Sequence, residues 1–256
     1  MTLHVTEAGE RGAPAVVLLH GAGVSGWMWH RQAAALADEL HLLIPDLPGH
    51  GRSNRVPWTS VADTAAMITD LVAERTDDGR AFVVGLSLGG YVGLRLASTQ
   101  AWPTGLIVSG VSVLPHPHPR LVALAVAAAT PFLRSNWLLR ANARTLRVPE
   151  QDFPAYRASA RQADPRSIRQ ILREATSFRL PDEAATSRCP VLSVAGGDEQ
   201  QPVRDSVPLI AGTFPDADGR LVDGVGHAWN IELPDVFSAM IKARVLGDEL
   251  PAALHP

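Results

Sequence analysis

Short apolar runs alternate with longer helix-like stretches over most of this 256-residue chain, and this alternation restricts its fold more than any other feature. Several runs are apolar at every position, which is typical of a parallel sheet that is buried on both faces. Since consecutive parallel strands need right-handed crossovers, the sequence predicts an α/β fold with a doubly wound, mostly parallel sheet. The predicted strands are residues 16–19, 42–44, 82–84, 106–108, 191–194 and 220–222, and the predicted helices are residues 29–40, 60–75, 88–99, 203–213 and 234–246.

The alternation breaks once, between about residues 114 and 180, where no convincing strand is found. We predict a helical cap at residues 115–180, inserted into a core made of residues 1–114 and 181–256. Such a cap would lie over the carboxyl ends of the strands, where ligands bind in open α/β sheets. Its apolar residues, most of which we expect to pack against the sheet, include Leu121, Leu124, Val126, Phe132, Leu133, Trp137, Leu138 and Leu139.

Length and composition indicate one globular domain with a large buried core, since 46% of the residues are hydrophobic and 19% are charged. The net charge of −3 gives no reason to expect nucleic acid or an anionic membrane as a partner. The single cysteine, Cys189, excludes an internal disulfide and gives no reason to expect an oxidising compartment.

The first residues lack the basic start and apolar run of a signal peptide. The longest apolar stretch, residues 121–133, is too short to span a bilayer. We therefore expect a cytoplasmic protein without membrane insertion. The sequence leaves open whether it is a monomer or a homodimer.

The sequence GLSLGG, at residues 85–90, follows one predicted strand and precedes a predicted helix. A sharp turn between a strand and a helix puts Ser87 in a strained conformation with its hydroxyl exposed, and Gly85 and Gly89 let the neighbouring backbone pass. The helix that follows directs the positive end of its dipole toward developing negative charge. Nucleotide-binding folds also have glycine-rich turns here, but the Walker lysine is lacking. Ser87 is therefore a candidate nucleophile.

The sequence HGAG, at residues 20–23, follows the first predicted strand. A tetrahedral intermediate needs two N–H donors directed at its oxyanion, each contributing about 3 kcal/mol. We predict that the N–H groups of Ala22 and Leu88 form this oxyanion hole, because the glycines beside Ala22 allow a close approach of the backbone. His20 is interpreted as a structural hydrogen-bonding residue rather than a catalytic base.

A third sequence, DLPGHGRS at residues 46–53, could be a phosphate cradle, but it has no lysine and does not open directly into a helix. With HGAG, DLPGHGRS and GLSLGG in this order, the chain resembles the lid-bearing serine hydrolase and esterase branch of the α/β-hydrolase superfamily. The resemblance covers essentially the whole chain and implies an α/β-hydrolase fold, with the helical segment as its cap. It also implies a structural role for Asp46 and His50.

The family order of the catalytic groups is serine, acid, histidine. His227 follows the last predicted strand and precedes the last predicted helix, where the family has its catalytic histidine. The acid is expected after residues 191–194, where the family most often has Gly-x-x-Asp and this chain has GGDE. Counting from the first of these glycines places Glu199 at the acid position, and Asp198 stays open as the second candidate; either carboxylate can orient an imidazole.

Residue types exclude several reactions of the family. Ser87 stands where epoxide hydrolases and haloalkane dehalogenases have an aspartate nucleophile. Ala228 stands where hydroxynitrile lyases of this fold have a lysine. His116 and His118 could bind zinc, but the prolines around them and the lack of further ligands favour a rigid approach to the cap. We expect neither a metal nor another cofactor.

The expected reaction is acyl transfer to water, with a small ester as the substrate and Ser87 as the nucleophile. Leucines of the cap, Phe132 and Trp137 indicate an apolar pocket, although a helical cap must bury such residues in any case. Two alternatives stay open. The same triad is used by relatives for C–C bond cleavage or elimination, and the fold also serves as a small-molecule receptor with little turnover.

Overall fold

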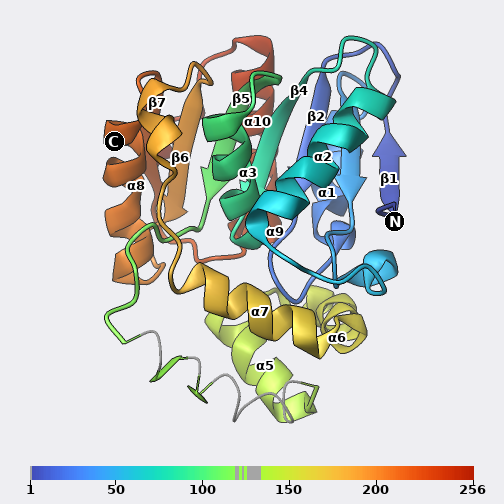
Figure 1. The fold of residues 1–256 in the computed structure, drawn as a ribbon, viewed down its shortest axis with the longest axis vertical. Helices are drawn as coiled ribbons and strands as arrows, with labels where there is room; N and C mark the ends of the chain where they lie inside the picture. The colour runs from blue at the N-terminus through green and yellow to red at the C-terminus, as the bar shows by residue number, and fades with distance from the viewer. Residues whose placement is uncertain (1, 119–120, 123, 126–133) are drawn as a thin grey trace.

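The computed structural model describes residues 2–118, 121–122, 124–125 and 134–256. These residues form one sheet in the order β1-β3-β2-β4-β5-β6-β7-β8 (Figure 1). Neighbouring strands from β3 to β7 are parallel, and the edge strands β1 and β8 are antiparallel to their neighbours. The strands are Val5–Ala8 (β1), Ala15–Leu19 (β2), His41–Pro45 (β3), Ala81–Leu86 (β4), Pro103–Ser109 (β5), Val191–Gly196 (β6), Ala217–Val222 (β7) and Leu254–His255 (β8).

Helices cover both faces of the sheet, which confirms the predicted doubly wound α/β fold. Val17 and Leu19 of β2 pack into one core cluster, and Val16 and Leu18 pack into the other, all without exposed surface. Because successive side chains of a strand point to opposite faces, β2 has to be apolar at each of these positions. The helices on the first face are Val61–Arg75 (α2), Leu88–Thr99 (α3) and Gln201–Thr213 (α8), and those on the second are His30–Leu36 (α1) and Pro234–Leu246 (α10).

All six predicted strands and all five predicted helices occur, with differences at their ends. The helix predicted at residues 29–40 is shorter, because a 3₁₀ turn, Gly26–Trp29, precedes α1. Ser60 caps α2 by accepting a hydrogen bond from the N–H of Asp63 at 3.0 Å. The short strands β1 and β8 occur in addition to the six predicted strands. They lie at the edges of the sheet, where each has a partner strand on one side only.

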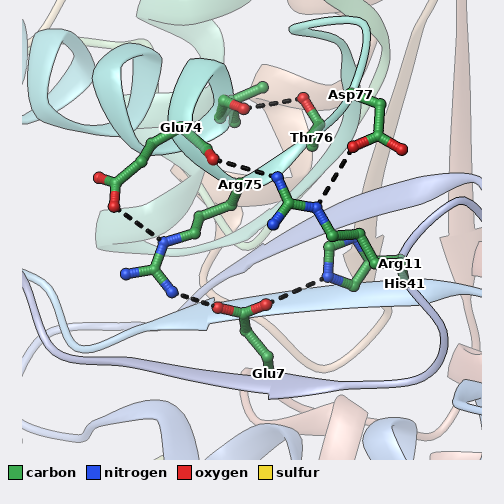
Figure 2. A network of polar contacts seen from close by, with 8 residues as sticks. Glu7, Arg11, His41, Glu74, Arg75, Thr76 and Asp77 are labelled. Carbon is green, nitrogen blue, oxygen red and sulfur yellow. Dashed lines mark hydrogen bonds and ion pairs between the residues drawn. The ribbon is translucent and has the colours of Figure 1, made fainter.

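Edge strand β1 is held by a polar network at the end of α2 (Figure 2). The Glu7 carboxylate lies 2.5 Å from Nη1 of Arg75 and 3.3 Å from Nε2 of His41. Burial raises the pKa of this carboxyl, but the hydrogen bonds from His41 and Arg75 outweigh burial and hold it below its usual value. The network therefore ties β1 to both β3 and α2.

A layer of helices lies beyond the carboxyl ends of the parallel strands (Figure 1). The described residues between β5 and β6 form helices and turns but no strand. The helices are Asn136–Thr145 (α5), Phe153–Gln162 (α6) and Pro165–Ala175 (α7). The bounds of the cap, residues 115–180, stay a prediction.

The expected packing of the cap's apolar residues against the sheet is wrong for three of them. Leu121, Leu124 and Trp137 are 64%, 68% and 65% exposed. The buried face of α5 is formed by Leu139 and Ala143, four residues apart, so Trp137 projects from another side of the helix. Val126, Phe132 and Leu133 lie outside the described residues.

Candidate active site

Ser87 occupies the turn between β4 and α3 with a φ of 54° and a ψ of −113°. This is a backbone conformation that residues other than glycine rarely adopt, and it persists only where the surroundings impose it. Here the N–H of Ser87 donates to the carbonyl of Ser109 at 2.8 Å, and the N–H of Gly89 donates to the carbonyl of His20 at 3.0 Å. A Cβ atom at Gly85 would lie 2.3 Å from the carbonyl oxygen of Gly89, so the turn requires glycine there.

The loop after β2, residues 20–23, runs directly beside Ser87. A Cβ atom built on Gly21 would lie 3.5 Å from the Cβ atom of Ser87. Within the part of the chain that the structure describes, the N–H groups of Ala22 and Leu88 have no protein acceptor. Two unpaired N–H groups beside a serine are what an oxyanion hole requires.

Two buried histidines hold this loop in place. His20 donates from Nδ1 to the carbonyl of Gly21 at 2.8 Å, and its Nε2 accepts from the N–H of Leu47 at 2.9 Å. His50 accepts from the N–H of Gly23 at 3.0 Å through Nε2. Burial lowers the pKa of His20 to about 4 and that of His50 to about 3, so both rings are neutral at neutral pH. These contacts make both residues structural.

Asp46 is likewise bound within the fold. Its carboxylate accepts hydrogen bonds from the N–H groups of Gly26 and Arg52, both at 2.8 Å. These bonds join the turn after β3 to the segment after β2, so Asp46 has a structural role.

The structure brings His227 and Glu199 together. Nδ1 of His227 donates to Oε2 of Glu199 at 2.6 Å, and Oε1 of Glu199 accepts from the N–H of Gly196 at 3.1 Å. The Glu199 side chain is 1% exposed, whereas that of His227 is 23% exposed. Because Nδ1 is engaged, Nε2 is the nitrogen that remains to exchange a proton.

Asp198 forms neither a hydrogen bond nor an ion pair with His227. Its side chain is 55% exposed and forms an ion pair with Arg147. Glu199 and Asp198 are adjacent, and the turn in which the N–H of Glu199 donates to the carbonyl of Gly196 sends their side chains in different directions.

Two cavities meet at Ser87, and His227 and Leu146 also line both. The larger has a volume of 740 Å³, and the smaller has a volume of 170 Å³. Leu146, which follows α5, was not expected as a site residue, since nothing in the local sequence separates it from the other leucines of the segment. The larger cavity is further lined by Tyr91, His116, Leu172, Thr176 and Val203, and the smaller by Val24, Trp27, Met28, Tyr156 and Ile231.

No group of three or more potential metal ligands occurs among the described residues. Nδ1 of His116 accepts a hydrogen bond from the N–H of His118 at 3.0 Å. No helix in the described ranges is long and apolar enough to cross a membrane.

Comparison with known proteins gives consistent matches. The model of the Alpha/beta hydrolase family matches residues 16–240. An "AB hydrolase superfamily protein" of Gibberella zeae is 28% identical over 250 residues, which cover 94% of this chain and 83% of the relative.

Solved structures with the same fold include enzymes of different specificity. A thermophilic esterase from Thermogutta terrifontis has a TM-score of 0.82 and 22% identity, covering 96% of this chain and 93% of the esterase. The epoxide hydrolase CorEH has a TM-score of 0.80 and 21% identity, covering 96% of this chain and 94% of the hydrolase. At these identities the likeness concerns the fold, and the reaction has to be argued from the site.

Proposed function

The chain belongs to the alpha/beta hydrolase family, and we propose that it is a serine hydrolase cleaving a carboxylic ester, or a related acyl bond, of a small and largely apolar substrate. The proposal rests on one arrangement: Ser87, on a strained turn, shares its cavities with His227, whose Nδ1 is bound by the buried Glu199. The fold is shared with both an esterase and an epoxide hydrolase and therefore does not determine the reaction. A serine at the turn favours acyl transfer.

In the first half of this mechanism, Oγ of Ser87 attacks the carbonyl carbon and His227 takes the hydroxyl proton at Nε2. Glu199 keeps the imidazole in the tautomer with Nδ1 protonated and stabilises the cation that forms. The N–H groups of Ala22 and Leu88 bind the oxyanion. His227 then gives its proton to the leaving alcohol, and the acyl group remains on Ser87.

In the second half, a water molecule attacks the acyl-enzyme. His227 takes a proton from the water, the same N–H groups bind the second oxyanion, and the carboxylic acid leaves as Ser87 regains its proton. No cofactor enters either half.

The two cavities support a substrate that is small on one side of the scissile bond. The 170 Å³ cavity lies against Gly21 and Ala22 and is otherwise lined mainly by apolar residues, including Val24, Met28 and Ile231. The 740 Å³ cavity accepts the larger side. A short acyl or alcohol group opposite a bulkier one fits this division.

The test combines a fluorophosphonate, which labels activated serines, with p-nitrophenyl esters of increasing acyl length. We expect labelling of Ser87 and ester turnover in the wild type, loss of both in Ser87→Ala, and retention of both in Ser177→Ala, an exposed serine that lines neither cavity. Labelling without turnover of any ester would indicate one of the alternatives, which are C–C bond cleavage or elimination by the same triad, or a receptor with little turnover. Absence of both would refute the proposal.

A further inference from the structure

Arg147 adopts a backbone conformation that its side chain does not favour. Its φ is +58°, in the left-handed region, just beyond the end of α5. The N–H of Val148 donates to the carbonyl of Ala143 at 2.9 Å, which closes the helix in the usual left-handed manner. Glycine or asparagine is the common residue at such a position. An arginine at this position suggests that contacts of its side chain offset the cost of the backbone conformation.

The Arg147 guanidinium lies between two carboxylates that belong to the segment after the helices α5–α7. It forms an ion pair with Asp198, and its Nε lies 3.1 Å from Oε2 of Glu232. Asp198 belongs to the acid loop, residues 197–200, between β6 and α8. Glu232 ends the short helix Trp229–Glu232 (α9), which follows the histidine loop, residues 223–228, after β7.

The stem of Arg147 crosses the histidine loop one residue before His227. A Cβ atom at Gly226 would lie 2.6 Å from Cδ of Arg147, so the glycine leaves the room that the arginine stem occupies. On the other side of His227, the N–H of Ala228 donates to the carbonyl of Leu146 at 3.2 Å. Both chain neighbours of His227 are therefore in contact with residues 146–147.

The same arginine therefore touches the residue before Glu199 and the residue before His227. The Nδ1–Oε2 contact of the pair lies between these two loops, whose backbones are also joined where the N–H of Asp198 donates to the carbonyl of Val225 at 3.1 Å. Side chains of Asp198 and Arg147 are 55% and 42% exposed, whereas that of Glu232 is 19% exposed. An ion pair as exposed as that between Arg147 and Asp198 stabilises a fold very little. We therefore expect Arg147 to affect the placement of His227 relative to Glu199 more than the stability of the fold.

We propose that Arg147 is a positioning residue of the hydrolytic site: it clamps the acid loop to the histidine loop and so holds His227 in register with Glu199 and Ser87. This inference rests on the proposed serine hydrolase function. It also assigns a role to Asp198, which anchors the clamp rather than orienting the histidine.

The test uses three substitutions of Arg147 and one matched control. Arg147→Met keeps the stem without the charge, Arg147→Lys keeps the charge, and Arg147→Gly relieves the left-handed conformation. Arg144→Met removes another exposed arginine of α5, for which no acidic partner occurs among the described residues. The readouts are kcat and KM for a p-nitrophenyl ester, the rate at which a fluorophosphonate labels Ser87, thermal unfolding, and the proton NMR signal of Nδ1–H of His227, assigned with His227→Gln.

We expect Arg147→Met and Arg147→Gly to lower kcat and the labelling rate by about ten- to a hundredfold, because small displacements of a catalytic group have effects of this size. KM should change less than about threefold, since Arg147 lines neither cavity. Arg147→Lys should recover part of the loss, and Arg144→Met should match the wild type. Thermal midpoints should stay within about 3 °C of the wild type.

The NMR signal separates this inference from the function itself. Loss or broadening of the His227 signal in Arg147→Met, with the signal kept in Arg147→Lys, would support the clamp even if the wild type hydrolysed no ester and Ser87 resisted labelling. Unchanged kcat, labelling rate and NMR signal in Arg147→Met would overturn it. A loss of activity that follows a large drop in the thermal midpoint would overturn it as well, by showing that Arg147 merely stabilises the fold.

Discussion

Nδ1 of His227 lies 2.6 Å from Oε2 of Glu199, and this contact joins the loop after β7 to the loop after β6. The carboxylate is buried beneath the imidazole, and its second oxygen is bound by the N–H of Gly196. A carboxylate held from both sides cannot turn away from the ring. The orientation of His227 toward the cavities therefore depends on Glu199 and on the backbone of Gly196, which holds the carboxylate in place.

The first prediction separates the two candidate acids. Glu199→Gln should lower kcat for ester hydrolysis by about 10³–10⁴-fold, because an amide at this position no longer selects the required imidazole tautomer. Asp198→Asn should lower it by about tenfold at most, through the weakened contact with Arg147. Steady-state kinetics on both variants decides the matter. An inactive Asp198→Asn with an active Glu199→Gln would show that the wrong acid has been chosen.

The second prediction concerns the strained turn. Ser87→Gly and Ser87→Ala should both lose activity, but Ser87→Gly should be more stable than Ser87→Ala by about 1 kcal/mol, because glycine adopts a φ of 54° without strain. Urea unfolding of the two variants measures the difference. Equal stabilities would mean that the turn stores no strain at Ser87.

The third prediction uses two glycines with the same φ of +68°. A Cβ atom at Gly110 would lie 2.8 Å from Cε1 of His227, whereas one at Gly79 would meet nothing within 4 Å. Both alanine variants should lose about 1 kcal/mol of stability through backbone strain. Only Gly110→Ala should also lower kcat, by displacing the ring. Equal kcat values for the two variants would argue that His227 has room to move without consequence.

The fourth prediction is a loss of stability in weak acid. His20 and His50 have pKa values of about 4 and 3 in the fold, below the ordinary 6.5. The unfolded chain therefore binds more protons between pH 6.5 and about 4, so stability falls as the pH falls through this window. Each ring should remove about 2 kcal/mol between pH 7.5 and 5.

Urea unfolding at pH 7.5 and 5 checks this, with His50→Gln as the comparison. Glutamine retains an acceptor for the N–H of Gly23 but does not titrate. The variant should therefore lose about 2 kcal/mol less than the wild type on acidification. An identical loss in both proteins would exclude His50 as a source of acid sensitivity.

The fifth prediction concerns substrate size. Leu146 lines both cavities, and its carbonyl accepts the hydrogen bond from the N–H of Ala228. Leu146→Ala should therefore preserve the backbone contact and enlarge the space at Ser87. We expect kcat/KM to rise for longer acyl esters relative to the acetate, measured across a p-nitrophenyl ester series. A uniform decrease for all chain lengths would show that Leu146 does not set substrate size.

Much of the fold follows from local sequence. Runs such as residues 16–19 are short and apolar at every position, a pattern that is typical of a strand buried on both faces. The glycines around Ser87 indicate the strained turn, because crowding at Gly85 is a local property of a strand that passes into a helix. The family and the α/β-hydrolase fold could therefore be recognised from the sequence, and both are confirmed.

The other residues of the candidate site are harder to predict from local sequence. Glu199 and Asp198 are neighbours with the same chemistry, so spacing along the chain hardly separates them; the direction of each side chain depends on how the acid loop packs against the histidine loop. Arg147 gives no signal in the sequence, because it is one arginine among many and its two carboxylate partners come from distant segments.

The sequence by itself determined how the six central strands and five helices of the core follow one another along the chain, and the serine at the turn, since each depends on residues within a few positions of one another. Tertiary structure alone decided which carboxylate meets His227, which arginine contacts both the acid loop and the histidine loop, and that Leu146 lines both cavities at Ser87. These are contacts between segments far apart in the chain, and their geometry is set by the packing of the whole sheet and its helices.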